Sequence, residues 1–135
     1  MTNNDLYSLA ESENIAIDLL HLPKNKSLSI TLDGKCYIAL DDKTVYTDSE
    51  TKVHLAHELG HCLTGAFYNM YSPLDLRDKH EYRANKWAVN NLIPKEKLIE
   101  LLKRGLEKWE IAEFFDVTEE FVNLAFKMYF DYLTS

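Results

Sequence analysis

The stretch from His57 to His61, His-Glu-Leu-Gly-His, constrains this chain more than any other feature of its sequence. Residues four apart in an α-helix lie one above the other on the same face, because each residue advances by about 100°. His57 and His61 can therefore direct both imidazoles at one metal ion, and Glu58 lies one step round the helix, within reach of a water on that metal. The pattern predicts a zinc-binding helix that carries its own general base.

The first open question is the third protein ligand. Catalytic zinc usually takes three protein ligands and leaves one position open for water. A third histidine six residues after His61 would complete the metzincin pattern, but that position is Phe67. The other common ligand is a glutamate on a later helix. Glu81 fits, because it begins a face at helical spacing that continues through Ala84, Asn85, Ala88 and Leu92.

The other residues on that face would support the site. The small side chains of Ala84 and Ala88 would let this helix approach the histidine helix closely. Asn85 is placed to hold the outer ring nitrogen of a ligand histidine and to fix the tautomer of that histidine.

Glu81 also has a competing interpretation as helix-start chemistry. With Asp78 it has the spacing of a capping box, which needs no metal. Asp78 and His80 are the alternative ligands, although His80 points about 100° away from the Glu81 face. We favour Glu81 as the ligand because of the zinc motif upstream and the small-residue face.

Other polar residues near these motifs have weaker roles. The candidates for stabilising the oxyanion formed on attack are Tyr68, Tyr71, His80 and Arg83, and the sequence does not rank them. His54 lies on the same helix face as the two motif histidines, one turn nearer the N-terminus, and is expected to be an ordinary exposed histidine.

The segment before the zinc motif predicts a helix and strands. Residues 3–20 have irregular amphipathic spacing, which predicts one helix. Residues 44–47 predict a short strand. Thr47 and Glu50 have the spacing of a capping box, which predicts the start of the zinc helix.

Residues 27–40 predict a β-hairpin, because apolar residues alternate with polar ones on both sides of Asp33-Gly34. A two-residue turn at Asp33-Gly34 would place the apolar residues of the two strands on opposite faces. A three-residue loop would instead pair Ile30 with Cys36 and join the two apolar sets on one face. We favour the three-residue loop.

The second half of the chain predicts a loop and then helices. The loop covers residues 68–76. The helices are expected over residues 78–93 (ending before Pro94), over 95–104 (stopping at Gly105) and over 109–132, the last broken near residues 116–117.

Composition bounds the function classes. The 135 residues, 46% hydrophobic and 27% charged, predict one globular domain over residues 1–135. A net charge of -7 argues against nucleic acid as a partner, since phosphate binding needs clusters of Lys and Arg. The chain has no signal peptide pattern and no stretch that could span a bilayer, so we expect a cytoplasmic protein with no membrane contact. Cys36 and Cys62 are too few for a disulfide framework, and each is expected to be a small buried residue.

Three segments in order resemble the ImmA/IrrE family of metallopeptidases. They are residues 55–61 (Leu-Ala-His-Glu-Leu-Gly-His), 81–88 (Glu-Tyr-Arg-Ala-Asn-Lys-Trp-Ala) and 92–94 (Leu-Ile-Pro), and they span about the middle third of the chain. This order is far more specific than the first motif alone.

The resemblance implies a cytosolic zinc endopeptidase. The fold would be α+β and zincin-like, with a small β-sheet, the histidine helix, the glutamate helix and a helical C-terminal part. His57, His61 and Glu81 would be the Zn²⁺ ligands and Glu58 the general base. Characterised members from mobile elements cleave a helix-turn-helix repressor, which implies a protein substrate of that kind from a phage or mobile element.

Two alternatives belong to other function classes. Residues 109–122 have helix-turn-helix spacing, which suggests a DNA-binding regulator, but the second helix opens with Glu119 and Glu120 and has only Lys127 as a basic residue. Recognition helices need basic and amide side chains there. The other alternative is a non-catalytic, zinc-containing protein-binding module that acts as an anti-repressor. Glu58 counts against it, because a structural site needs no base.

Overall fold

A computed structural model gives an α+β fold, as the sequence predicts. The structure describes residues 1–44, 46–65, 67 and 73–134, the last three of them without their side chains. The elements in chain order are α1 (Asn3–Ser12), β1 (Ala16–Leu20), β2 (Ser27–Leu32), β3 (Lys35–Asp41), α2 (Asp48–Thr64), α3 (Leu74–Leu92), α4 (Lys95–Lys103), α5 (Lys108–Phe115) and α6 (Glu119–Thr134).

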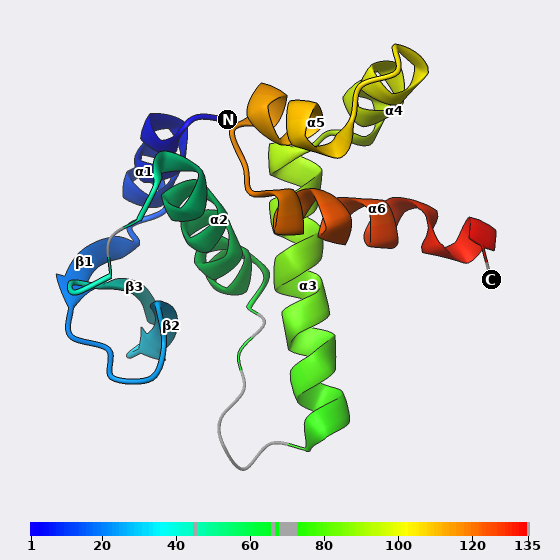
Figure 1. The fold of residues 1–135 in the computed structure, drawn as a ribbon. Helices are drawn as coiled ribbons and strands as arrows, with labels where there is room; N and C mark the ends of the chain where they lie inside the picture. Colours follow the sequence, from blue (N-terminus) through cyan, green and yellow to red (C-terminus); the bar gives the residue numbers. More distant parts are fainter. Residues whose placement is uncertain (45, 66, 68–72, 135) are drawn as a thin grey trace.

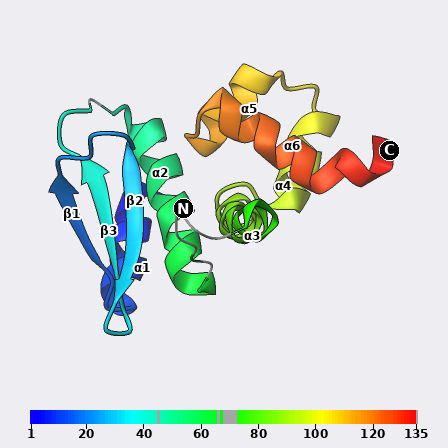
Figure 2. The ribbon, with the colours of Figure 1, turned by 90° about the horizontal axis from the view of Figure 1, so that it is seen from below.

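These elements form layers in which α2 lies between the sheet and α3 (Figures 1 and 2). The sheet has the order β1-β3-β2, with β3 parallel to β1 and antiparallel to β2. Helices α1 and α2 lie against one face of the sheet, α3 runs beside α2, and α4, α5 and α6 lie on the side of α2 away from the sheet, where the end of α5 contacts α2. Because α2 lies between the sheet and α3, its side chains can reach either neighbour.

The hairpin forms as predicted, but its register differs from the one we favoured. The turn contains only Asp33 and Gly34, so Thr31 rather than Ile30 pairs with Cys36. Asp33 has a φ of 52° and Gly34 a φ of 76°. Positive φ at both turn residues is typical of the type I′ turn, whose twist matches that of the two strands. The register is therefore set by the local turn geometry, and not by the joining of the two apolar sets on one face.

This register decides which side chains of β2 face the helices. Ser27 and Ser29 pair with inward-facing residues of β3 and lie on the face that α2 covers. Leu28, Ile30 and Leu32 lie on the opposite face, where each is more than a third exposed. Figure 2 shows no described element over that face. The strand thus presents its polar side to the interior of the molecule.

The predicted single helix over residues 3–20 is wrong in its second half. Helix α1 ends at Ser12, and Asn14 takes a left-handed conformation with a φ of 58°. The chain then enters β1, which pairs in parallel with β3. Its partner strand lies about twenty residues later, so this pairing is a tertiary effect that local spacing does not reveal.

The start of α2 agrees with the predicted capping box. The Thr47 side chain accepts from the Glu50 backbone N–H, and the Glu50 side chain accepts from the Thr47 N–H. The short strand predicted over residues 44–47 is wrong, because Thr44, Tyr46 and Thr47 have no strand conformation. These residues instead form the approach to the helix.

Helix α3 begins at Leu74, four residues earlier than predicted, so residues 74–76 of the predicted loop are helical. Residues 68–72 of that loop lie outside the described part of the chain. The later elements agree with prediction. Helix α4 ends just before Gly105, which has a φ of 82°, and α5 and α6 are separated at Asp116, which has a φ of 54°.

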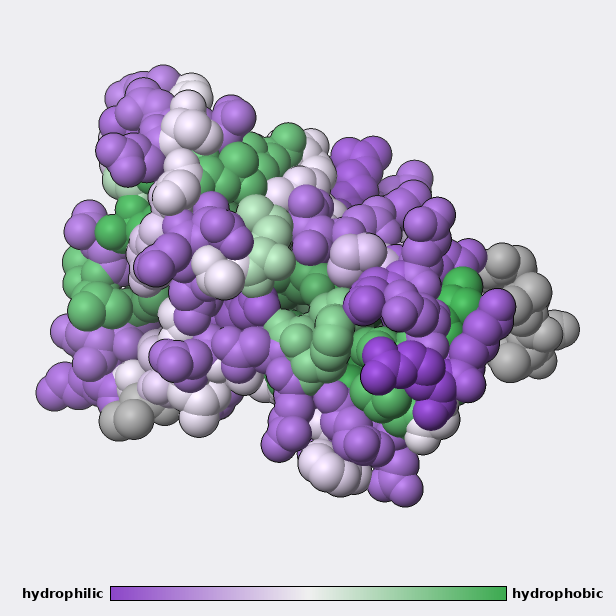
Figure 3. Space-filling model, turned by 90° about the horizontal axis from the view of Figure 1, so that it is seen from above, coloured by the Kyte–Doolittle hydropathy of each residue, from purple (hydrophilic) through white to green (hydrophobic). Residues whose placement is uncertain are grey.

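The core joins the sheet side to the helical side through α2. Leu55 and Leu59 on α2 are fully buried. Lys52 is also buried, and its ammonium donates to the Phe115 carbonyl at the end of α5, at 2.5 Å. The face in Figure 3 is mainly hydrophilic, with hydrophobic side chains in several separate patches. Of the helices described, none combines the length and apolar character needed to cross a membrane.

Candidate metal centre

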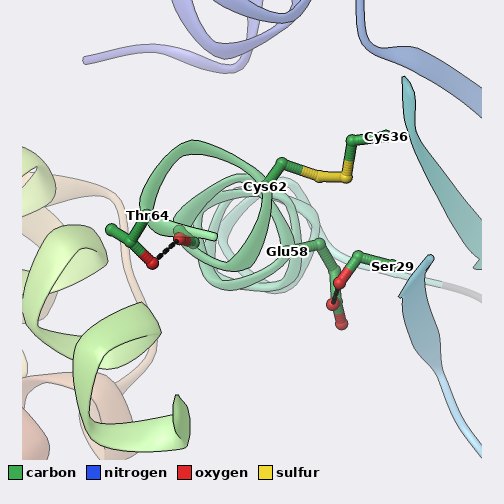
Figure 4. The surroundings of a disulfide bond; sticks show 6 residues. Ser29, Cys36, Glu58, Cys62 and Thr64 are labelled. Atoms are coloured by element: carbon green, nitrogen blue, oxygen red, sulfur yellow. Dashed lines mark hydrogen bonds between the residues drawn. A yellow bond between two sulfur atoms is a disulfide. The ribbon is translucent and has the colours of Figure 1, made fainter. Parts of the chain in front are cut away.

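Helix α2 directs the residues of the His-Glu-Leu-Gly-His motif to two neighbours. His57 and His61 turn toward α3, and their side chains are 24% and 7% exposed. Glu58 is 5% exposed and turns toward β2, where Figure 4 shows it opposite Ser29. The two histidines therefore meet groups from α3, while the glutamate meets groups from the sheet.

The structure brings His57, His61 and Glu81 together as one group, which we call the candidate metal centre. The two Nε2 atoms lie 3.2 Å apart. His57 Nε2 lies 3.1 Å from Glu81 Oε2, and His61 Nε2 lies 3.0 Å from Glu81 Oε1. Three side chains on two helices thus direct their donor atoms at one small volume.

These donors fit a zinc ion in both type and spacing. Two histidines and one glutamate form a known catalytic zinc set, with ligand bonds of about 2.0–2.2 Å. Tetrahedral ligands at that bond length stand about 3.3 Å apart, close to the observed 3.0–3.2 Å. The Glu81 side chain is 34% exposed, so the centre is open to solvent on one side.

Glu81 lies well inside α3, which removes its competing interpretation. The helix starts at Leu74 with Pro73 as its N-cap, so Asp78 and Glu81 do not form a capping box. Asp78 is exposed, and neither it nor His80 belongs to a group of described residues that could hold a metal with the two motif histidines.

Small residues set the distance between the two helices, as predicted. Ala84 and Ala88 on α3 are fully buried. On the opposing side, Gly60 of α2 faces the Ala84 backbone so closely that a Cβ would lie 3.0 Å from two of its atoms. The two alanines were predicted from their helical spacing, whereas the role of Gly60 was not predicted.

Asn85 occupies the predicted supporting position. Its Oδ1 lies 2.8 Å from His57 Nδ1, one helical turn after Glu81. Because the amide oxygen only accepts, His57 carries its hydrogen on Nδ1 and directs Nε2 toward the candidate metal centre.

The charge environment of His57 favours its protonated form in the absence of metal. Burial alone would lower the pKa of His57, but the hydrogen bond to Glu81 and the charges of Glu58 and Glu81 raise it above its ordinary value. A metal ion binds the neutral imidazole and must displace this proton. Metal binding at this site is therefore coupled to proton release.

Two serines missed by the sequence analysis contact the motif glutamate. The Ser27 hydroxyl donates to Glu58 Oε2 at 2.6 Å, and the Ser29 hydroxyl donates to Oε1 at 2.8 Å. The signal that would have found them is the alternation of β2. In the two-residue-turn register, both serines face the helices.

His54 is not the exposed histidine that we expected. It is partly buried, and its ring packs against Tyr46 edge-on with ring centroids 5.5 Å apart. Its Nδ1 lies 3.2 Å from the Ser27 hydroxyl oxygen. Burial lowers the pKa of His54 below its ordinary value, which favours the neutral ring.

The predicted oxyanion candidates are not resolved into one choice. Tyr68 and Tyr71 lie outside the described residues. His80 and Arg83 both lie on α3, outside the candidate metal centre. Beside the centre, a cleft of about 540 Å³ extends from Glu81 toward α6. Its walls include Asn85, Tyr82, Leu124, Lys127 and Met128.

The prediction that Cys36 and Cys62 are separate buried residues is wrong, because they form a disulfide (Figure 4). Cys36 lies on the inner face of the central strand, and Cys62 lies on the sheet side of α2. Their Cα atoms are 5.8 Å apart, within the usual range. The pairing depends on how α2 packs on the sheet, which cysteine counting cannot supply.

Comparison with known proteins identifies a family. Residues 13–127 match the model of the peptidase M78 family, described as the IrrE N-terminal-like domain. The matched stretch contains every residue of the candidate metal centre and both serines on β2. No curated protein matches the chain.

Proposed function

This chain belongs to the peptidase M78 family, and from that membership we propose that it is a zinc-dependent endopeptidase. The observation that carries the proposal is the convergence of His57, His61 and Glu81, with Glu58 next to His57 on α2. This set combines three metal-binding groups with a carboxylate that is not needed to hold a metal.

Each residue of the site would have a separate role. His57, His61 and Glu81 would hold the ion, and Asn85 would keep the His57 ring in position. Bound zinc supplies Lewis-acid activation of water and of a peptide carbonyl. The Glu58 carboxylate would take a proton from the attacking water and later give it to the leaving amine.

For the substrate we propose a protein regulator in the cytoplasm, such as the helix-turn-helix repressor of a phage or mobile element. The resemblance of the three motif segments supports this choice, and the net charge of -7 disfavours a nucleic-acid substrate. The cleft beside Glu81 offers apolar walls from Leu124 and Met128 for a substrate side chain.

Metal analysis of the purified protein tests the ligand set. We expect about one zinc per chain, as a single three-ligand site would hold, and a strong loss of zinc in His61→Ala and Glu81→Gln. Asp78→Asn is the matched control, because Asp78 is an exposed carboxylate one turn earlier on α3. Full zinc in Glu81→Gln with loss in Asp78→Asn would show that the third ligand has been assigned wrongly.

A cleavage assay tests the activity. The zinc-loaded protein is incubated with candidate helix-turn-helix repressors from the genes that flank its own, and the products are identified by mass spectrometry. We expect cleavage by the wild type and none by Glu58→Gln. Cleavage that persists in Glu58→Gln contradicts the role of Glu58, whereas repressor binding without cleavage favours the non-catalytic module. A DNA shift at physiological salt favours the regulator.

A further inference from the structure

Glu58 is a buried carboxylate with a hydroxyl donor on each oxygen. Ser27 donates to Oε2 at 2.6 Å and Ser29 donates to Oε1 at 2.8 Å. The two serines are two residues apart on β2, so strand alternation points both at α2. Figure 4 shows Ser29 and Glu58 reaching toward each other across the gap between strand and helix. Two donors from one rigid strand fix the orientation of the carboxylate plane.

The chemistry of these donors leaves the carboxylate able to act as a base. Each carboxylate oxygen has two lone-pair positions, and one hydroxyl hydrogen uses only one of them. Both oxygens of Glu58 therefore retain a position that can take up a proton.

Ser27 is itself held in place by a second hydrogen bond, from His54. Its single hydroxyl hydrogen is used in the bond to Glu58, so its oxygen accepts from His54 Nδ1–H at 3.2 Å. His54 is in turn packed against Tyr46, whose hydroxyl donates to the backbone carbonyl of Lys26. The hydroxyl of Ser27 thus has one orientation that satisfies both neighbours.

We propose that Ser27 and Ser29 are positioning residues that fix the orientation of the Glu58 carboxylate, one residue along α2 from His57, with Ser27 oriented by His54. This inference rests on the proposed peptidase function, because it concerns the base of that reaction. The competing explanation is that a buried carboxylate needs hydrogen-bond partners for stability alone. A positioning role changes kcat while zinc content and KM stay the same, whereas a stability role changes the unfolding transition and leaves the kcat of the folded protein unchanged.

The first test compares three variants of β2 in the cleavage assay. Ser29→Ala removes one donor, Ser29→Thr restores a hydroxyl, and Thr31→Val removes a hydroxyl from the next residue on the same strand face. We expect kcat to fall about 10–100-fold in Ser29→Ala, with zinc content and KM close to wild type. Ser29→Thr and Thr31→Val should keep kcat within about threefold of wild type.

The second test does not depend on activity. The infrared difference between wild type and Glu58→Gln isolates the carboxylate band of Glu58. We expect this band to shift in Ser29→Ala and to remain in place in Ser29→Thr and Thr31→Val. If Ser29→Ala does not fold, Ser27→Ala provides the same comparison.

The outcomes separate this inference from the proposed function. An unshifted band in Ser29→Ala, or a wild-type kcat in that variant, overturns the positioning role. If the wild type cleaves no candidate substrate, the proposed function fails, and the infrared band still decides whether the serines hold the Glu58 carboxylate.

Discussion

Gly60 on α2 lies directly against the backbone of Ala84 on α3. A Cβ on Gly60 would lie 3.0 Å from the Cα and from the carbonyl carbon of Ala84, and closer still to the carbonyl oxygen. Backbone atoms cannot rotate away as a side chain does, so any larger residue here must push the helices apart. The two helices carry the three residues of the candidate metal centre, and this contact therefore sets the distance between His61 and Glu81.

We predict that Gly60→Ala destabilises the protein although alanine is the better helix former. The gain in helix propensity is about 1 kcal/mol. Overpacking against a fixed backbone costs about 1–3 kcal/mol, and it also widens the gap that a metal must bridge. Urea unfolding should show a net loss of stability, and zinc titration should show weaker binding.

Gly34→Ala is the control for this substitution. Gly34 also carries strain when replaced, because its φ is 76°, but a Cβ there meets no atom within 4 Å. This variant should lose stability while it keeps the zinc affinity of the wild type. A Gly60→Ala protein that is as stable as the wild type and binds zinc equally well would contradict the role of the close contact.

A second prediction concerns Asn85, whose Oδ1 accepts from His57 Nδ1 at 2.8 Å. Asn85→Ala should weaken zinc binding by about 10–100-fold, because the His57 ring loses the partner that fixes its tautomer. Asn85→Asp should restore or strengthen binding, since a carboxylate accepts the same hydrogen bond with more charge. Zinc affinity measured by competition with a chelating dye checks both variants. Equal affinity in Asn85→Ala and wild type would show that this contact does not support the ligand.

The residues of the site that could be predicted from the sequence all follow from the periodicity of the α-helix. His57, His61 and Glu81 follow from helical spacing within two segments, and Asn85 follows because it lies one turn after Glu81. Helical spacing is local, so it holds wherever the helix packs. The structure places these four residues close together.

The parts that could not be predicted depend on packing between distant segments. Ser27 and Ser29 reach Glu58 only because the hairpin turn has two residues and because β2 lies over α2. The Cys36–Cys62 disulfide has the same dependence on how the helix sits on the sheet. Both hairpin registers were compatible with the sequence. We favoured the register that joins the apolar residues on one face, and this register is wrong.

A third prediction concerns acid stability. Hydrogen bonds from the Thr47 backbone N–H and from its hydroxyl lower the pKa of Glu50 below its ordinary value of 4.5. Because the folded pKa is lower than the unfolded one, the contribution of Glu50 is fully present above about pH 4.5 and is lost as pH falls through the folded pKa. The free energy of unfolding, measured in urea at a series of pH values, should therefore fall below about pH 4.5.

Glu50→Gln tests whether this carboxylate causes part of the loss of stability at acidic pH. Glutamine keeps an oxygen that can accept the Thr47 N–H, but it does not titrate. The fall in unfolding free energy below pH 4.5 should be shallower in Glu50→Gln than in wild type, and Thr47→Ala should flatten it in the same way. If the unfolding free energy falls with pH equally steeply in all three proteins, the capping box does not contribute to the loss of stability in acid.

The last prediction concerns the disulfide between Cys36 on β3 and Cys62 on α2. The two residues are 26 apart in sequence, and a closed loop of that length removes about 3.5 kcal/mol of chain entropy from the unfolded state. Reduction should therefore lower the free energy of unfolding by about 2–4 kcal/mol. Urea unfolding with and without a phosphine reductant measures this difference. The Cys36→Ser/Cys62→Ser protein is the control, because it should be insensitive to reductant.

The same bond bears on the compartment that we propose, because a reducing cytoplasm keeps most thiols free. Protein trapped with an alkylating reagent inside the cell should then carry two modified cysteines, and protein purified in air should carry none. Cys62 directly follows His61, so the reduced form should keep its zinc only if the packing of α3, rather than the disulfide, holds the histidine in place. If the reduced protein keeps its full zinc content but is less stable, the disulfide stabilises the fold and is not needed for the metal site. Loss of zinc on reduction would instead make the metal site depend on the redox state of the protein.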